Sequence, residues 1–311
     1  MGGPRGGGVM EPEVRYCTTS DGVRIAYTVT GEGPPLLECL DPLFSHVQLE
    51  WAHPVGGRIL REFARSNTLI RFDFRGCGLS DRVVAQTLDE QVLDIEAVVR
   101  RTGFEQLALL ALQLATPPAI AFAARHPEQV SRMVIQNGFS RPSELLGTQQ
   151  ARALLAAAKV DWLVATEAMG AVAFGGGQDP NKVHGEFIRK CIGPEYFETV
   201  EIAATWDASE MARSVAAPTL VIVESRIQFV PMDSAKDLVA RIPNAQLFVV
   251  EGKWPESTDT VVQRAIHFLN GGVSEPRPAL ELPSGTAIIL FADIVDSTAL
   301  TERFGDATYR A

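Results

Sequence analysis

Hydrophobic and polar positions alternate with two different periods along this chain, and the change between them outlines its elements. Residues 14–19 and 23–30 are short strand-like runs on either side of the turn residues Ser20, Asp21 and Gly22, which predicts a hairpin. Residues 34–40 form a third, more apolar strand. Strand-like and helix-like runs then take turns: strands at 68–74, 107–112, 130–135, 219–224 and 245–250, helices at 87–101, 119–125, 234–241 and 259–269. This alternation predicts an α/β fold with a mostly parallel sheet covered on both faces by helices.

A long segment between two of the late strands carries only the helical pattern. It extends from residue 139 to about 216, with helical runs at 149–166 and 196–209 separated by a glycine cluster. A helical insertion between two strands of a parallel sheet is typical of a lid over the strand ends. The sequence therefore predicts a ligand site beneath a helical lid.

Three further segments differ in composition from the predicted domain at 14–271. Residues 1–13 are rich in glycine, and we expect them to be disordered. Residues 272–284, rich in Gly, Pro and Glu, predict a linker. Residues 285–311 begin a new unit with a strand, a polar turn and the start of a helix, which is too short for a domain.

Composition and charge narrow the class of protein. The net charge of −10 and the pI near 5.1 argue against nucleic acid and anionic membranes as partners. No stretch is long and apolar enough to cross a bilayer. The cysteines have no C-x-x-C spacing, so we expect reduced thiols in a cytoplasmic protein; they are Cys17, Cys39, Cys77 and Cys191.

The crossing from the strand at 107–112 to the helix at 119–125 is the most informative local feature. In enzymes that carry a nucleophile on such a turn, the pattern is G-x-S-x-G. Here the frame runs from Ala111 to Ala115, and Gln113 stands at the nucleophile position. A carboxamide is a poor nucleophile because its nitrogen lone pair is delocalised. Pro117 and the preceding Thr116 suggest that the helix begins late, so we expect an opened or shifted turn.

Three sequence blocks carry a resemblance to a known fold. They are LIRFDFRGCGLSDR at 69–82, SHVQLEW at 45–51 and RHPEQVSRMVIQNG at 125–138. With them the chain resembles the α/β-hydrolase fold over residues 14–271. It is most similar to the hydrolase-like domains fused ahead of class III adenylyl cyclases. AIILFADIVDSTALTERFGD at 287–306 resembles the opening of a class III cyclase catalytic domain.

The hydrolase resemblance implies a catalytic triad whose three positions are all substituted here. Gln113 replaces the nucleophile, residues 225–229 around Ile227 hold no acid, and the loop 251–257 has no histidine. We therefore expect no conventional triad hydrolysis. The resemblance also implies backbone oxyanion donors at Leu114 and in the loop 41–44, which do not depend on a serine.

Residues near the substituted turn and in the loop 41–46 are candidates for lining a ligand pocket. They are Gln113, Leu114, Pro42, Leu43 and His46. For Gln113 the competing interpretation is a satisfied polar residue that closes a dead site. For His46 it is a structural hydrogen-bond partner.

The cyclase resemblance implies a second set of residues. In that family Asp293 and the carbonyl of Ile294 bind Mg²⁺ or Mn²⁺, and Ser297 and Thr298 lie near the nucleotide phosphates. The family's remaining catalytic residues lie beyond residue 311, so we expect no cyclic nucleotide from this chain. Class III sites form between subunits, which implies a homodimer through the cyclase domain. We expect no cofactor in the hydrolase-like domain.

These observations lead to one main hypothesis and two alternatives. The main hypothesis is a non-catalytic sensory or regulatory module of a class III adenylyl cyclase that binds a small molecule under the lid, or a partner protein. The first alternative is an active hydrolase of an ester or similar small molecule with an unconventional constellation, for instance Glu224 with His267. The second is a degenerate, truncated gene product without activity.

Overall fold

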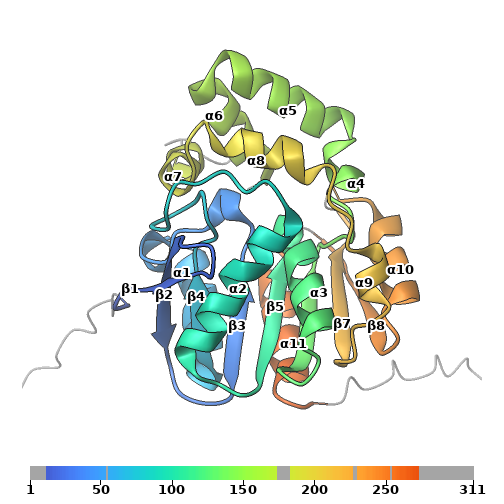
Figure 1. The fold of residues 1–311 in the computed structure, drawn as a ribbon. Coiled ribbons are helices and arrows are strands. Elements are labelled where there is room, and N and C mark those ends of the chain that lie inside the picture. Colours follow the sequence, from blue (N-terminus) through green and yellow to red (C-terminus); the bar gives the residue numbers. More distant parts are fainter. Residues whose placement is uncertain (1–11, 54, 174–182, 227–229, 253, 273–311) are drawn as a thin grey trace, which may run out of the picture. The chain divides into compact units, whose positions relative to one another are not determined.

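An eight-stranded sheet forms the centre of the computed structural model, which describes residues 12–53, 55–173, 183–226, 230–252 and 254–272 (Figure 1). The strand order is β1-β2-β4-β3-β5-β6-β7-β8. β1 and β2 form the predicted hairpin, and β2 also runs antiparallel to β4. All other neighbours are parallel, which confirms the mostly parallel sheet. The strands are β1 Arg15–Thr18, β2 Arg24–Thr30, β3 Pro35–Cys39, β4 Thr68–Phe72, β5 Leu107–Leu112, β6 Val130–Gln136, β7 Thr219–Glu224 and β8 Ala245–Val250.

Helices cover both faces of this sheet. Successive side chains of its central strand, β5, therefore point into two different cores. Leu109 and Ala111 of β5 pack into one core, and Ala108 and Leu110 pack into the other. The first core is completed by α2 (Leu88–Thr102), α3 (Thr116–Arg125) and α10 (Met232–Arg241), and the second by α1 (Gly56–Ser66) and α11 (Thr258–Leu269). Burial on both faces explains why β5 is an unbroken apolar run.

The predicted lid segment carries helices that lie above the strand ends (Figure 1). They are α4 Ser143–Leu146, α5 Gln149–Val160, α6 Trp162–Ala173, α7 Val183–Cys191 and α8 Tyr196–Ala203. The last helix of the segment, α9 Ser209–Ala212, lies beside α3 and α10 instead. The single helical run expected at 149–166 is broken at Asp161, whose carboxylate accepts the N–H of Val164 at 3.0 Å. That capping bond begins α6, and the backbone N–H of Asp161 donates to the carbonyl of Ala157 at the end of α5.

Several predictions concern residues that the structure does not describe. The glycine-rich start at 1–11, Ile227 and everything from 273 onward lie outside the described residues, including the predicted linker and the cyclase-like segment 285–311. Among the described residues, no helix has both the length and the apolar character to cross a bilayer.

Candidate functional site

The turn after β5 has a strained backbone conformation, whereas the sequence predicted an opened or shifted turn. A 3₁₀ turn at Gln113–Ala115 leads without a break into α3, and Gln113 has a φ of 47°. Thr116, expected to cap a later helix, is itself helical with φ −67° and ψ −48°. The expectation of an opened turn is wrong. Pro117 does not delay the helix, because N–H groups of the first turn have no intrahelical partner to lose.

The loop after β3 supplies a carboxylate that the sequence analysis missed. Asp41 precedes the 3₁₀ turn Pro42–Phe44 and is only 2% exposed. Its Oδ1 accepts the N–H of Leu43 at 3.0 Å, and its Oδ2 accepts the N–H of Leu114 at 3.3 Å. A side chain of the chain itself therefore occupies the backbone donors that were expected to bind a substrate oxygen. An aspartate at the first position of the predicted oxyanion loop was the available signal.

The environment of Asp41 makes its carboxyl group unusually basic. Burial raises its pKa to about 6, although the hydrogen bonds from Leu43 and Leu114 act in the opposite direction. The ionised and neutral forms of Asp41 are therefore both accessible near neutral pH. A carboxylate with such a pKa is suited to take up a proton from a weak acid such as water.

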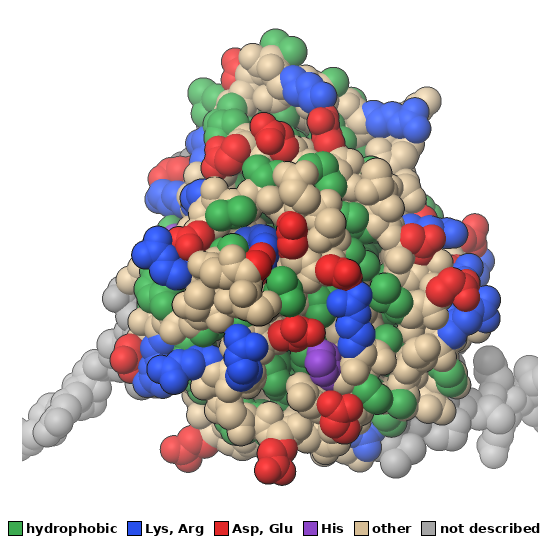
Figure 2. Space-filling view, viewed as in Figure 1, with side chains coloured by type: hydrophobic (Ala, Val, Ile, Leu, Met, Phe, Trp, Pro, Cys, Tyr) green, Lys and Arg blue, Asp and Glu red, His purple; other side chains and the backbone are tan. Residues whose placement is uncertain are grey.

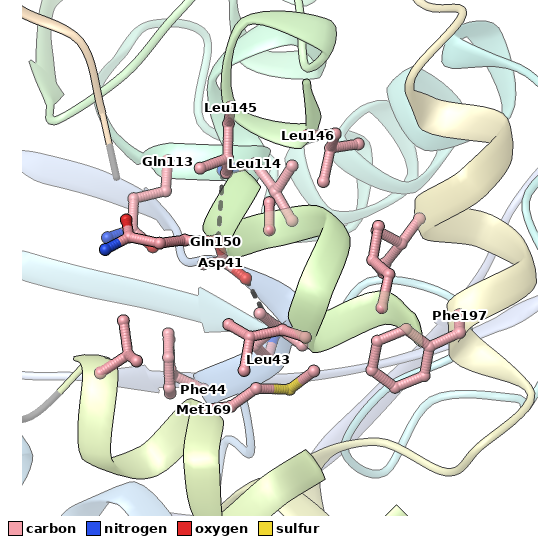
Figure 3. A pocket seen from close by; sticks show the side chains of 15 residues that line it. Asp41, Leu43, Phe44, Gln113, Leu114, Leu145, Leu146, Gln150, Met169 and Phe197 are labelled. Atoms are coloured by element: carbon pink, nitrogen blue, oxygen red, sulfur yellow. Dashed lines mark hydrogen bonds between the residues drawn. The ribbon is translucent and has the colours of Figure 1, made fainter. Parts of the chain in front are cut away.

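Asp41 lies at the base of a pocket between the sheet and the lid helices (Figure 3). The pocket has an empty volume of about 710 Å³, including its open mouth. Asp41, Gln113 and Gln150 are its polar lining residues. The rest are apolar, namely Leu43, Phe44, Leu114, Leu145, Leu146, Ala151, Leu154, Leu155, Met169, Val172, Phe197 and Val200. Most of the apolar wall comes from the lid, so the pocket is suited to an apolar molecule with one polar centre.

The structure separates the predicted pocket candidates into two groups. Gln113, Leu114 and Leu43 line the pocket, whereas Pro42 and His46 are not among its lining residues. His46 is buried, and its Nδ1 accepts the N–H of Leu49 at 3.2 Å. Burial lowers its pKa, so the neutral ring is favoured in this structural role.

The region where a triad acid and histidine are expected holds a closed hydrogen-bond network instead. The carboxylate of Glu224, at the end of β7, accepts hydrogen bonds from the amide of Asn137 at 2.5 Å and from the hydroxyl of Ser257. All three side chains are buried. His267 is exposed on α11, so the structure does not bring it together with Glu224.

The predicted metal and phosphate ligands cannot be placed. Asp293, Ile294, Ser297 and Thr298 lie outside the described residues. Within the part of the chain that the structure describes, no group of three or more His, Cys, Asp or Glu side chains is arranged to hold a metal ion.

Comparison with known proteins identifies the fold. Residues 49–168 match the model of the alpha/beta hydrolase fold family. A pyrrolizixenacetamide deacetylase of Xenorhabdus hominickii is 23% identical over 231 residues, which cover 72% of this chain and 85% of the relative. A putative carbamate hydrolase, RutD, of Caulobacter sp. (strain K31) is 24% identical over 198 residues, covering 58% and 70%. The crystal structure of the enol-lactonase from Burkholderia xenovorans LB400 covers 82% of this chain and all of its own, with a TM-score of 0.68 and 17% identity.

These similarities overturn the main functional hypothesis. A non-catalytic sensory module of a class III adenylyl cyclase is wrong, because the proteins that resemble this chain are a deacetylase, a carbamate hydrolase and a lactonase. The expectations of a pseudoenzyme and of an adenylate cyclase are wrong for the same reason. The misleading signal was the loss of all three triad residues, which excludes one mechanism but does not exclude hydrolysis by another.

The parallel sheet, the helices on both of its faces, the strained turn after β5 and the matched structures lead to one conclusion. The described chain has the α/β-hydrolase fold.

Proposed function

We propose that this protein hydrolyses a small, uncharged and largely apolar acyl compound, such as an ester, lactone or carbamate. The observation that carries the proposal is a buried carboxylate, Asp41, at the base of an apolar pocket beside the turn where this fold places its reacting group. The similarity to a deacetylase, a carbamate hydrolase and an enol-lactonase supports the reaction class.

In this mechanism Asp41 is a general base toward water. As the water oxygen attacks the carbonyl carbon, one of its protons passes to the Asp41 carboxylate, and the carbonyl π electrons move to oxygen. The tetrahedral intermediate then collapses, the bond to the leaving group breaks, and protonated Asp41 returns the proton to that group. Atoms and charge balance without a covalent enzyme intermediate, so no serine is required.

Gln113 is suited to stabilise the oxyanion. The N–H groups of Leu43 and Leu114 are already bonded to Asp41, so they are not free to do so. Gln113 lines the same pocket, and its carboxamide has two N–H donors. A side-chain amide is an established alternative to backbone donors for this purpose.

The test is hydrolysis of a panel of p-nitrophenyl esters with the full chain. We expect kcat/KM to fall as pH drops below about 6, the pKa of Asp41, because the base is then protonated, and to be level above it. Asp41→Asn is expected to lower kcat/KM by about 10²- to 10⁴-fold, the usual contribution of a general base.

Asp89→Asn is the matched control, because Asp89 is an exposed aspartate on α2 that pairs with Arg125. It is expected to leave kcat/KM unchanged. Turnover that survives Asp41→Asn, or a covalent acyl adduct detected by mass spectrometry, would contradict the mechanism. Absence of turnover across esters, lactones and carbamates would contradict the proposed function itself.

A further inference from the structure

Asp41 retains hydrogen-bonding capacity that the fold does not use. An ionised carboxylate has about four lone-pair positions, and the backbone bonds from Leu43 and Leu114 occupy two of them, one on each oxygen. Asp41 is a lining residue of the pocket, so a bound molecule lies close to this group. The natural partner for a free carboxylate lone pair is a hydrogen-bond donor.

Among the described residues, no cation lines the pocket beside Asp41. The pocket-lining residues include no Lys, Arg or His, and Asp41 is the one acidic residue among them. Tyr196 of α8 is a titratable group near enough to Asp41 to be affected by its charge. Burial raises the pKa of Tyr196 well above its usual value, so its hydroxyl stays neutral. A second anion in this pocket therefore meets an uncompensated negative charge.

The remaining walls favour a hydrocarbon chain. Met169 from α6 and Phe197 from α8 face the pocket together with leucines of α4 and α5 (Figure 3). Burial of a flexible alkyl group against these side chains contributes the hydrophobic part of the affinity. The pocket thus combines an apolar wall with a carboxylate that accepts hydrogen bonds.

We propose that this pocket binds an apolar carboxylic acid in its neutral form, with one proton shared between the carboxyl group of the ligand and Asp41. A carboxyl group donating to a carboxylate forms a short, charge-assisted hydrogen bond, whereas two carboxylates at that separation repel each other. Binding of the acid as it exists at neutral pH therefore requires uptake of one proton.

If the proposed hydrolysis is accepted, on which this step rests, binding of the acid regulates the reaction. The acid is the product of acyl hydrolysis. It is released readily while both carboxylates are ionised, and it is retained, as an inhibitor, once the medium is acidic enough to supply the shared proton. Release of product above neutral pH would therefore be driven by repulsion.

The direct test uses isothermal titration calorimetry of the full chain with octanoic acid and with octanamide at pH 5.5, 7 and 8. Above pH 7 we expect the Kd of octanoic acid to rise about tenfold per pH unit, because one proton is taken up on binding. The Kd of octanamide is expected to change less than about threefold, because its N–H donates to Asp41 without a shared proton. Equal affinity for octanoic acid at pH 5.5 and 8, or absence of its binding at pH 5.5, would overturn the inference.

Asp41→Asn gives an independent test. Its amide donates to the octanoate anion, so the pH dependence is expected to disappear, whereas Asp89→Asn is expected to retain it. Octanamide binding and the thermal unfolding midpoint show whether the variant is folded. An Asp41→Asn protein that keeps the wild-type pH dependence would also overturn the inference.

Turnover of p-nitrophenyl octanoate, measured in parallel, separates the two proposals. Absence of turnover together with proton-coupled acid binding contradicts hydrolysis alone. Turnover with acid binding that is independent of pH contradicts the shared proton alone.

Discussion

A single residue, Gln113, shows that the strained turn of this fold does not depend on its usual chemistry. Its φ of 47° lies in a region that side-chain-bearing residues seldom adopt. Ala111 and Ala115 on either side are fully buried, so the packing of β5 and α3 holds the backbone in this form. The conformation is held by the packing of these neighbours and does not require a serine at this position.

Gln113→Val is expected to lower the free energy of unfolding by about 1–3 kcal/mol, because a β-branched side chain is poorly tolerated at positive φ. Gln150→Val is the matched control, since Gln150 lines the same pocket but lies in the regular helix α5. It is expected to cost only about 0.5 kcal/mol of helix propensity. Urea unfolding measures both variants, and equal losses would contradict strain at Gln113.

At the scale of elements, the buried network of Asn137, Glu224 and Ser257 joins the loop after β6, the end of β7 and the loop after β8. Asn137 also accepts the N–H of Glu224 at 3.0 Å, so its amide bonds both the backbone and the side chain of that residue. The network satisfies a carboxylate that would otherwise be buried without partners. The network therefore holds these three segments together at the ends of the strands nearest the lid.

Ser257→Ala removes one of the hydrogen bonds to the buried Glu224. We expect a loss of about 1–3 kcal/mol in the free energy of unfolding, the cost of an unsatisfied buried group. Ser214→Ala, at an exposed position, is expected to be nearly neutral. Chemical denaturation monitored by tryptophan fluorescence compares the two, and a neutral Ser257→Ala would show that this bond adds no stability.

The element pattern was readable from sequence where local signals are strong. The strand at residues 107–112 was predicted to the residue, because an apolar run bounded by polar positions is a local signal. The helix expected at 234–241 begins at Met232 instead, just after Pro231. Pro231 is the N-cap and has an extended backbone, a feature that hydrophobic periodicity does not reveal.

For the whole molecule, the attachment of the lid to the sheet domain is the feature most relevant to function. The guanidinium of Arg82 donates to the carbonyl of Gly78 at 3.0 Å and to that of Cys191, at the end of α7, at 3.0 Å. The N–H of Gly78 also donates to Cys191 at 2.6 Å. On the face shown in Figure 2, acidic and basic side chains are interspersed, with no large field of one sign. The lid is therefore joined to the sheet domain by hydrogen bonds at Cys191, in addition to the packing of its apolar side chains into the core.

Arg82→Ala is expected to increase amide hydrogen exchange in residues 183–191 several-fold, with little change in the central strands, because local opening of α7 then costs less. Arg65→Ala is the control, since Arg65 is an exposed residue of α1 that pairs with Glu62 at 2.6 Å. Hydrogen exchange followed by mass spectrometry reports both segments. Unchanged exchange in α7 would show that Arg82 does not hold the lid.

The sequence by itself determined the order of strands and helices along the chain, the position of the lid segment and the absence of triad residues. Periodicity and residue identity are local properties, so they can be read without the structure. Tertiary structure decided what replaces the triad. Asp41 meets the N–H of Leu114 across 73 positions, and Glu224 meets Asn137 across 87. Neither pairing follows from a local pattern, because each depends on which loops the parallel sheet brings to the same edge.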